Sequence, residues 1–367
     1  MTRRALFASL VCLMVLAEAC SLQEPASLDD PELLDRIGVE TPTDIVWTRT
    51  IDGIEVAGTT RAADPAELSV LTRALAEVPD ALVSAADVRT IYRITDAAEE
   101  DLEPTTLAFA RGPDLYVLDA TFAGIYGEGV GPMEMARVLS HELAHVAQFR
   151  RLTADDAGLI LESPTDVDPL QLAESTRDFA AATGWRDGGS DPRSPSWVLP
   201  SPGGTTAYGG TEPEEDLAEA VSMVSMGWAT QLSADRVAWV EDWLDLDADR
   251  VATGKPYIPA GAIPTSSETD LYDTRTVSGF AARNPEPLYW VALGADFDST
   301  RAEIGAALAE RGVAGAFEPI EIGTVPREGG RFGRPDGVSY WVEVWDFSGS
   351  AISGAPDGLV ITYVVLW

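Results

Sequence analysis

The most constraining feature of this 367-residue chain is the sequence His-Glu-Leu-Ala-His at positions 141–145, which contains both of its histidines. Residues four apart on an α-helix lie on the same face about one turn apart, so both imidazoles can bind one Zn²⁺ ion. A helix is expected here because Gly131-Pro132 is a typical helix start and apolar residues follow at helical spacing. These apolar residues are Met135, Val138, Leu139 and Val146. The pattern predicts a largely buried helix that carries the zinc ligands His141 and His145; the alternative is two surface histidines without a metal.

Glu142 follows the first histidine and cannot easily bind the same ion together with both histidines. Its carboxylate can instead accept a proton from the water that attacks a carbonyl group, and later pass it to the leaving amine. The motif therefore predicts metal-assisted hydrolysis with Glu142 as the catalytic base.

A catalytic zinc ion takes three protein ligands, and with no further histidine and no nearby cysteine the third must be a carboxylate. Glu215 and Glu219 lie four apart in a segment that predicts a helix, with Thr211 and Glu214 as its capping box. We expect Glu215 to bind zinc and Glu219 to accept a hydrogen bond from a ligating histidine. Glu214, Asp216 and Glu219 are the other candidate ligands, and the plain alternative is that Glu215 and Glu219 are solvated surface carboxylates.

The chain resembles the gluzincin metallopeptidases of the lethal-factor-like kind. The resemblance rests on His-Glu-Leu-Ala-His, on Glu-Asp-Leu-Ala-Glu-Ala at 215–220 and on Tyr208, seven residues before Glu215. It covers residues 44–246 and includes the Phe179–Trp185 segment. It implies a zincin-like catalytic domain, with a small sheet, an active-site helix and a helical lower subdomain.

The resemblance also implies roles for two further parts of the chain. Tyr208 would stabilise the oxyanion of the tetrahedral intermediate, a role that suits a phenol O–H; the alternative is simple packing. The segment Leu115–Asp119 would be the edge strand that pairs with an extended peptide substrate. As an ordinary strand of the sheet it needs no such role.

The N-terminus has the features of an export signal, with Arg3 and Arg4 before an apolar run from Ala5 to Leu16. Small residues then precede Cys20, as in the bacterial lipoprotein box, so we expect a signal peptide over residues 1–19 and a lipid on Cys20. Glu18 departs from that box, and cleavage that leaves a free thiol is the alternative. Both predict an extracytoplasmic protein; lipidation makes it membrane-anchored, and no transmembrane helix is expected in the mature chain.

The net charge of −35, with Lys255 as the only lysine, excludes nucleic acid as a partner and disfavours contact with anionic lipid headgroups. The expected partner is a peptide or protein substrate, and we expect a monomer.

The sequence predicts an α+β protein with two domains. A tether over residues 20–43 precedes the metallopeptidase domain at 44–256, and a linker at 257–286 leads to a smaller α+β domain at 287–367. In the first domain, residues 45–56 predict a hairpin with an Asp52-Gly53 turn. In the last, Trp290, Trp341 and Trp345 could form a partner or substrate surface, although alternating aromatic residues in strands are more often core.

These features predict zinc-dependent hydrolysis of peptide bonds in extracellular proteins or peptides. Two alternatives stay open at this point. One is a catalytically silent, zinc-binding recognition lipoprotein, against which the intact Glu142 argues. The other is a cell-wall amidase that applies the same chemistry to peptide crosslinks, because the sequence does not reveal substrate choice.

Overall fold

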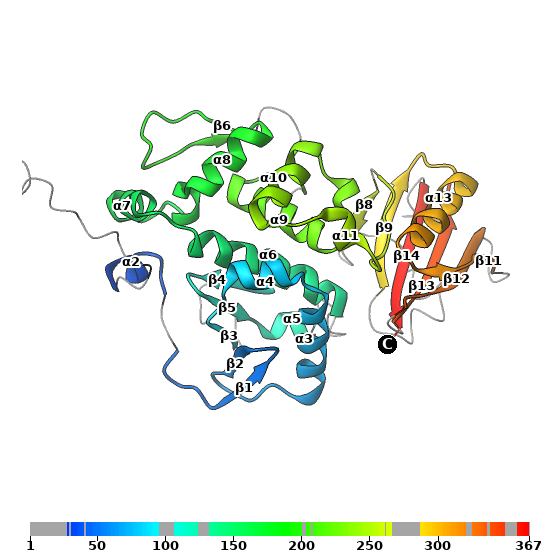
Figure 1. Ribbon diagram of the computed structural model, residues 1–367, viewed down its shortest axis with the longest axis horizontal. Coiled ribbons are helices and arrows are strands. Elements are labelled where there is room, and N and C mark those ends of the chain that lie inside the picture. Colours follow the sequence, from blue (N-terminus) through cyan, green and yellow to red (C-terminus); the bar gives the residue numbers. More distant parts are fainter. Residues whose placement is uncertain are drawn as a thin grey trace, which may run out of the picture.

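The computed structural model describes residues 28, 31–39, 42–94, 106–123, 132–199, 203–206, 208–260, 262–265, 287–320, 325–335, 338–348 and 358–366. The fold is α+β, as expected, with an N-terminal sheet, a central group of helices and a C-terminal sheet (Figure 1). The expected signal peptide and Cys20 lie outside the described residues, as does most of the expected linker. No helix of the described part of the chain is long and apolar enough to cross a bilayer.

The N-terminal sheet has five strands in the order β1-β2-β3-β5-β4. Their bounds are β1 Trp47–Ile51, β2 Ile54–Gly58, β3 Thr90–Arg93, β5 Asp114–Val117 and β4 Ala108–Arg111. The hairpin prediction is confirmed: β1 and β2 are antiparallel, and Asp52 and Gly53 adopt the φ values of 48° and 89° that the tight turn requires.

The prediction of an edge strand at Leu115–Asp119 is wrong, because β5 lies inside the sheet between β3 and β4. The outer strand is β4, which sequence analysis did not identify. Tyr116 of β5 stacks on Phe109 of β4 with ring centroids 4.6 Å apart, a cross-strand aromatic pair that favours this arrangement.

One face of this sheet is covered by three helices, α3 (Pro65–Glu77), α4 (Asp80–Ala86) and α6 (Pro132–Arg150). Helix α3 begins at a capping box in which Asp64 and Glu67 exchange side chain to backbone hydrogen bonds. Helix α6 carries the His-Glu-Leu-Ala-His motif and lies between the sheet and the central helices (Figure 1). Its apolar stripe is buried against α3 and α4, which confirms the predicted buried helix.

The central helices pack on the other side of α6. They follow the short α5 (Asp119–Ala123), and their bounds are α7 Ala154–Glu162, η2 Pro169–Leu172, α8 Glu174–Thr183, α9 Pro213–Ser225, η3 Ala229–Gln231, α10 Ala234–Leu244 and α11 Ala248–Ala252. A short ribbon of β6 (Arg186–Asp187) and β7 (Trp197–Val198) separates α8 from α9. Helix α9 is almost completely buried and lies along α6. The elements that carry the two halves of the predicted metal site are therefore neighbours.

Part of the expected tether is folded onto the body of the protein. Residues Pro31–Arg36 form helix α2, which packs against α7. Leu33 is fully buried beside Ala157 and Ile160, and Arg36 Nε donates to the Ile160 carbonyl at 3.3 Å.

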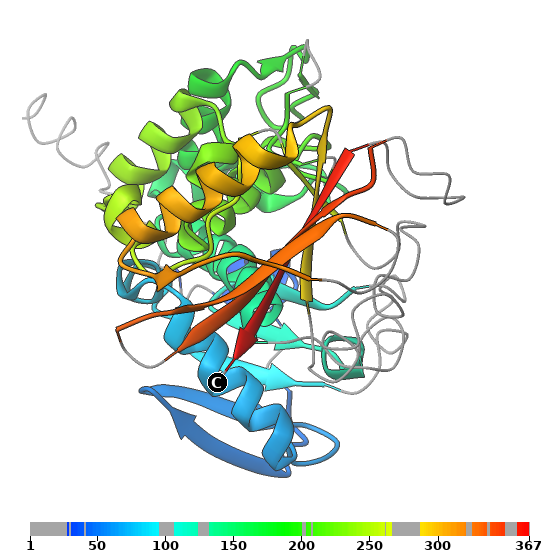
Figure 2. The ribbon, with the colours of Figure 1, turned by 90° about the vertical axis from the view of Figure 1, so that its right-hand side faces the viewer.

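The C-terminal sheet has the strand order β10-β12-β13-β14-β9-β8, with β11 pairing β12, and α13 packs against it (Figure 2). The bounds are β8 Ile263–Thr265, β9 Pro287–Leu293, α13 Phe297–Glu310, β10 Ala314–Gly315, β11 Glu318–Pro319, β12 Arg327–Gly333, β13 Ser339–Asp346 and β14 Gly358–Leu366. Strand β8 falls within the range expected to be linker. Strand β12 was missed because it is glycine-rich, and Gly330 is required there because a Cβ would lie 1.9 Å from the Ala316 carbonyl oxygen.

The two halves of the chain share one hydrophobic core and one buried ion cluster. Lys255 Nζ lies 2.5 Å from Glu77 Oε2, and Arg334, which follows β12, lies 3.1 Å from Glu77 Oε1. Tyr340 of β13 donates to the Gly254 carbonyl at 2.7 Å. Trp345 is 1% exposed, so it belongs to the core rather than to an exposed surface.

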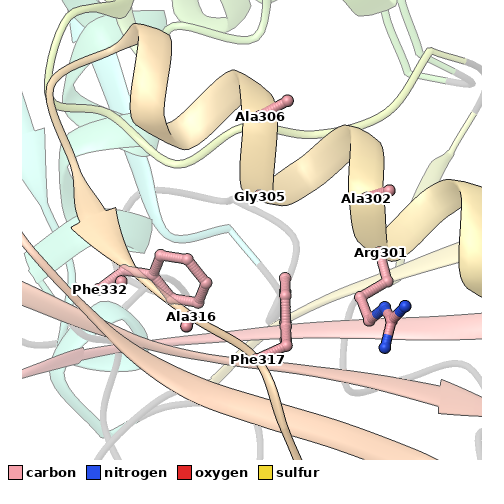
Figure 3. A pocket seen from close by; sticks show the side chains of 8 residues that line it. Arg301, Ala302, Gly305, Ala306, Ala316, Phe317 and Phe332 are labelled. Atoms are coloured by element: carbon pink, nitrogen blue, oxygen red, sulfur yellow. The ribbon is translucent and has the colours of Figure 1, made fainter.

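A shallow groove lies between α13 and the neighbouring strands (Figure 3). It is lined mainly by Ala302, Gly305, Ala306 and Phe317, with Arg301 at one end. Arg301 pairs with Glu328 at 2.5 Å. The lining residues include no imidazole and no carboxylate. The groove is therefore not a site for the metal-assisted hydrolysis that His-Glu-Leu-Ala-His predicts.

Candidate metal centre

Helices α6 and α9 bring together His141, His145 and Glu215. The two Nε2 atoms of the histidines lie 3.2 Å apart, and Glu215 Oε2 lies 3.1 Å from that of His141 and 3.5 Å from that of His145. Ligands at 2.0–2.1 Å from a tetrahedral zinc ion are separated by about 3.3 Å, so these three atoms already have the spacing of three zinc ligands. The group can hold a metal ion.

The electrostatic environment of the centre favours positive charge. Burial alone would lower the pKa of His141, but hydrogen bonds to Glu215 and Glu219 raise it to about 10. The pKa of His145 is also raised, because the negative charge of Glu215 outweighs its burial. The two histidines in turn hold the pKa of Glu215 well below its usual range, although burial acts against this. The carboxylates that favour protonated imidazoles would also stabilise a bound dication.

Each histidine is held by a second contact through its other ring nitrogen. Glu219 Oε1 lies 3.0 Å from His141 Nδ1, which is the contact expected from the sequence, and Arg137 lies 3.5 Å from the same oxygen. Gln148 Oε1 lies 3.0 Å from His145 Nδ1, and Gln148 Nε2 donates to Thr176 Oγ1 at 2.8 Å.

Sequence analysis missed Gln148 and Thr176. A signal for Gln148 was available, because an amide three residues after His145 on the apolar side of a buried helix needs a polar partner. No sequence pattern connects Thr176 of α8 to this helix, so only the fold reveals that contact.

Glu142 lies at the same centre and is 8% exposed. Burial raises its pKa, while the neighbouring histidines oppose that effect. A carboxylate buried beside two histidines is placed to accept a proton and to return it.

The expected capping box of Thr211 and Glu214 is wrong. Helix α9 begins one residue later than expected, with Glu212 at the N-cap and Pro213 in the first turn. A proline is favoured there because its missing N–H needs no partner. Thr211 Oγ1 instead donates to the Tyr208 carbonyl at 2.6 Å.

Tyr208 lies beside the centre on the loop that precedes α9. Its ring centroid is 5.8 Å from that of His141, and its side chain remains 56% exposed. Burial of the hydroxyl, the charge of Glu215 and a hydrogen bond to that residue raise the pKa of Tyr208, so the phenol stays protonated.

The loop is tied closely to α9. Thr205 N–H donates to Asp216 Oδ1 at 2.7 Å, and Gly209 N–H donates to Thr206 Oγ1 at 2.9 Å. Asp216, one of the alternative ligands, is not available to a metal because it also accepts from Trp185 Nε1 at 2.9 Å and pairs with Arg236.

No protein-family model, curated protein or solved structure matches this chain. In the described part of the chain, His141, His145 and Glu215 are the one set of three whose ligand atoms all lie within 4.8 Å of one another.

Proposed function

We propose that this protein is a zinc-dependent peptidase of the gluzincin type, with a zincin-like catalytic domain and the centre at His141, His145 and Glu215. The observation that carries the proposal is the near-tetrahedral spacing of their three ligand atoms, from 3.1 to 3.5 Å. Two imidazoles and one carboxylate are a typical ligand set for catalytic zinc, which leaves a fourth position open for water or substrate.

Glu142 and Tyr208 supply the groups that hydrolysis needs. When bound, zinc would polarise the scissile carbonyl and lower the pKa of the attacking water. Glu142, buried at the same centre, would accept the proton of this water and deliver it to the leaving amine. Tyr208 remains a hydrogen-bond donor at neutral pH and can stabilise the negative charge that develops on the carbonyl oxygen.

The substrate chain can bind in an extended conformation along β4. This strand forms one edge of the N-terminal sheet and packs against α6, the helix of the motif. Main-chain hydrogen bonds to an edge strand provide affinity with little side-chain selection. We place the protein outside the cytoplasm, anchored through a lipid on Cys20.

The test compares wild type with Glu142→Gln for cleavage of an internally quenched peptide library and for zinc content by elemental analysis. We expect Glu142→Gln to keep one equivalent of zinc and to lose cleavage, while His145→Ala and Glu215→Ala lose the metal. Glu162→Gln, the same change at an exposed position of α7, is the matched control and should keep both.

Each other outcome points to a different conclusion. Zinc binding without cleavage in wild type would support a recognition protein. Cleavage of purified peptidoglycan but not of linear peptides would support a cell-wall amidase. Metal-free wild type, or full zinc content in Glu215→Ala, would contradict the proposed centre.

A further inference from the structure

Tyr208 is placed beside the metal centre by the loop that carries it. We call residues 203–211 the Tyr208 loop; the structure describes all of them except residue 207. The Tyr208 side chain is 56% exposed, and its ring centroid lies 5.8 Å from that of His141. An exposed ring has few packing contacts to fix its place, so its position depends on the backbone. Catalysis needs a fixed position, because a displacement of about 1 Å can cost about 100-fold in rate.

The Tyr208 loop is closed on itself. Gly209 N–H donates to Thr206 Oγ1 at 2.9 Å, and Gly210 N–H donates to the Thr206 carbonyl at 3.0 Å. A Cβ on Gly204 would lie 2.4 Å from Gly210 Cα, so the two ends of the loop are in direct backbone contact. The loop is therefore a compact unit, and its contacts with the rest of the protein set the place of Tyr208.

The Tyr208 loop is attached to α9 at Asp216, the residue that follows the candidate ligand Glu215. Thr205 N–H donates to Asp216 Oδ1 at 2.7 Å, and Thr205 Oγ1 donates to the Asp216 carbonyl at 3.3 Å. A Cβ on Gly209 would lie 3.2 Å from Asp216 Cα, so the loop also rests on the helix backbone there. A hydrogen bond to a carboxylate is stronger than one between neutral groups, so Asp216 contributes strongly to this attachment.

Asp216 is itself held in place by other elements. It is fully buried, and its carboxylate accepts from Trp185 Nε1 at 2.9 Å and from Arg236 Nε at 3.1 Å. Trp185 follows α8, Arg236 belongs to α10, and both side chains are buried. The Asp216 carboxylate thus has a position that does not depend on the loop, and it joins the loop to α9, to α10 and to the end of α8.

We propose that Asp216 is a positioning residue for Tyr208. Through Thr205 it holds the Tyr208 loop on α9, next to Glu215, and so keeps the phenol beside His141 when a substrate binds. The proposal rests on the proposed peptidase function, in which the Tyr208 hydroxyl donates to the oxyanion. Asp216 itself takes no part in the chemistry.

The test is a double-mutant cycle with the zinc-loaded protein. Asp216→Asn keeps the size of the side chain but presents N–H groups to the surrounding donors, so the loop should lose its fixed place. We expect kcat to fall about 10-fold to 100-fold when Tyr208 is present, with little change in KM. The same change in a Tyr208→Phe background should lower kcat by no more than about 2-fold, because the group that Asp216 positions is already absent.

Asp156→Asn is the matched control. Asp156 is 1% exposed, pairs with Arg177 and accepts from the backbone N–H of Glu174 at 2.9 Å, so it has the same kinds of partner as Asp216. Its replacement should affect kcat equally in the Tyr208 and Tyr208→Phe backgrounds.

A second variant tests the same contact without breaking the pair of Asp216 with Arg236. Thr205→Pro removes the N–H donor, and it decides the question if Asp216→Asn does not fold. Hydrogen exchange of the Tyr208 loop, measured by mass spectrometry, reports the attachment independently of activity. We expect faster exchange in Asp216→Asn and Thr205→Pro, and exchange as in wild type in Asp156→Asn.

The outcomes separate the positioning role from the function on which it rests. Equal losses of kcat with and without the Tyr208 hydroxyl would overturn the positioning role and leave the peptidase proposal intact. Unchanged exchange of the Tyr208 loop in the folded variants would do the same. Wild type that cleaves no peptide would overturn the peptidase proposal, and the positioning role with it.

Discussion

His145 Nδ1 lies 3.0 Å from Oε1 of Gln148, one turn further along α6. The amide group of Gln148 is in turn fixed by Thr176 Oγ1, at 2.8 Å. This chain connects a candidate zinc ligand to α8 and sets the orientation of its ring, so that Nδ1 donates the hydrogen bond and Nε2 faces the other two ligand atoms.

Replacement of Thr176 by valine should weaken metal binding. Valine has nearly the same shape but cannot accept the hydrogen bond, so Gln148 would lose its fixed orientation. We expect zinc affinity to fall about 10-fold, within the range for such outer contacts. The measurement is competition with a zinc chelator. Thr176→Ser, which keeps the hydroxyl, is the control, and equal affinity in both variants would contradict the role of this chain.

Replacement of Tyr208 by phenylalanine should lower kcat by about 100-fold to 1000-fold, the effect of removing one oxyanion donor. The exposed position of the ring predicts no comparable loss of stability. Steady-state kinetics and a thermal unfolding curve check both expectations. Tyr92→Phe, on the stacked aromatic cluster of the N-terminal sheet, is the matched control, and a mainly raised KM in Tyr208→Phe would indicate a binding role instead.

The stability of the protein should decrease at acid pH through Glu67. Burial alone would raise the pKa of Glu67, but hydrogen bonds from Arg61, Arg93 and the Asp64 backbone lower it from 4.5 to about 2. Because the folded pKa is below the unfolded one, this contribution is complete above about pH 4.5 and disappears as the pH falls toward 2. We expect the contribution of Glu67 to the free energy of unfolding to be about 1–2 kcal/mol, because solvent around the half-exposed Arg61 screens its ion pair with Glu67.

Urea unfolding of wild type and Glu67→Gln at several pH values tests this expectation. Glutamine can still serve the capping box of α3, so the comparison isolates the charge. The difference in unfolding free energy should be largest above pH 5 and shrink at lower pH. A difference that is constant with pH would show that Glu67 contributes no charge-dependent stability.

Replacement of Lys255 by methionine should destabilise the folded protein by about 3 kcal/mol, because Glu77 would stay buried with one cation fewer. Lys255 Nζ also donates to the Glu77 carbonyl at 2.6 Å, so the change also weakens the attachment of the segment after α11 to the end of α3. Urea unfolding gives the measurement. Arg49→Met, at an exposed cation of β1, should have little effect. If the two variants unfold alike, the ion pair of Lys255 with Glu77 does not stabilise the fold.

Local sequence patterns predicted the elements that depend on neighbouring residues. The spacing of His141 and His145, the Asp52-Gly53 turn and the apolar stripe of α6 each need only a few consecutive positions, because a helix or a hairpin fixes their relative placement. The same is true of the i, i+4 pair Glu215 and Glu219. Both carboxylates contact His141, so they are not the solvated surface carboxylates of the alternative prediction.

Several contacts of this protein join segments that lie far apart in the chain. Strand β4 becomes the sheet edge because it pairs beyond β5, and helix α2 joins the body because Leu33 finds an apolar partner on α7. Thr176 can support Gln148, and through it His145, only after α8 packs against α9. Such contacts arise from packing between elements, so no spacing within the sequence encodes them. Local spacing in the sequence thus identified the residues that can hold a metal ion, and packing between distant elements supplies the contacts that orient them.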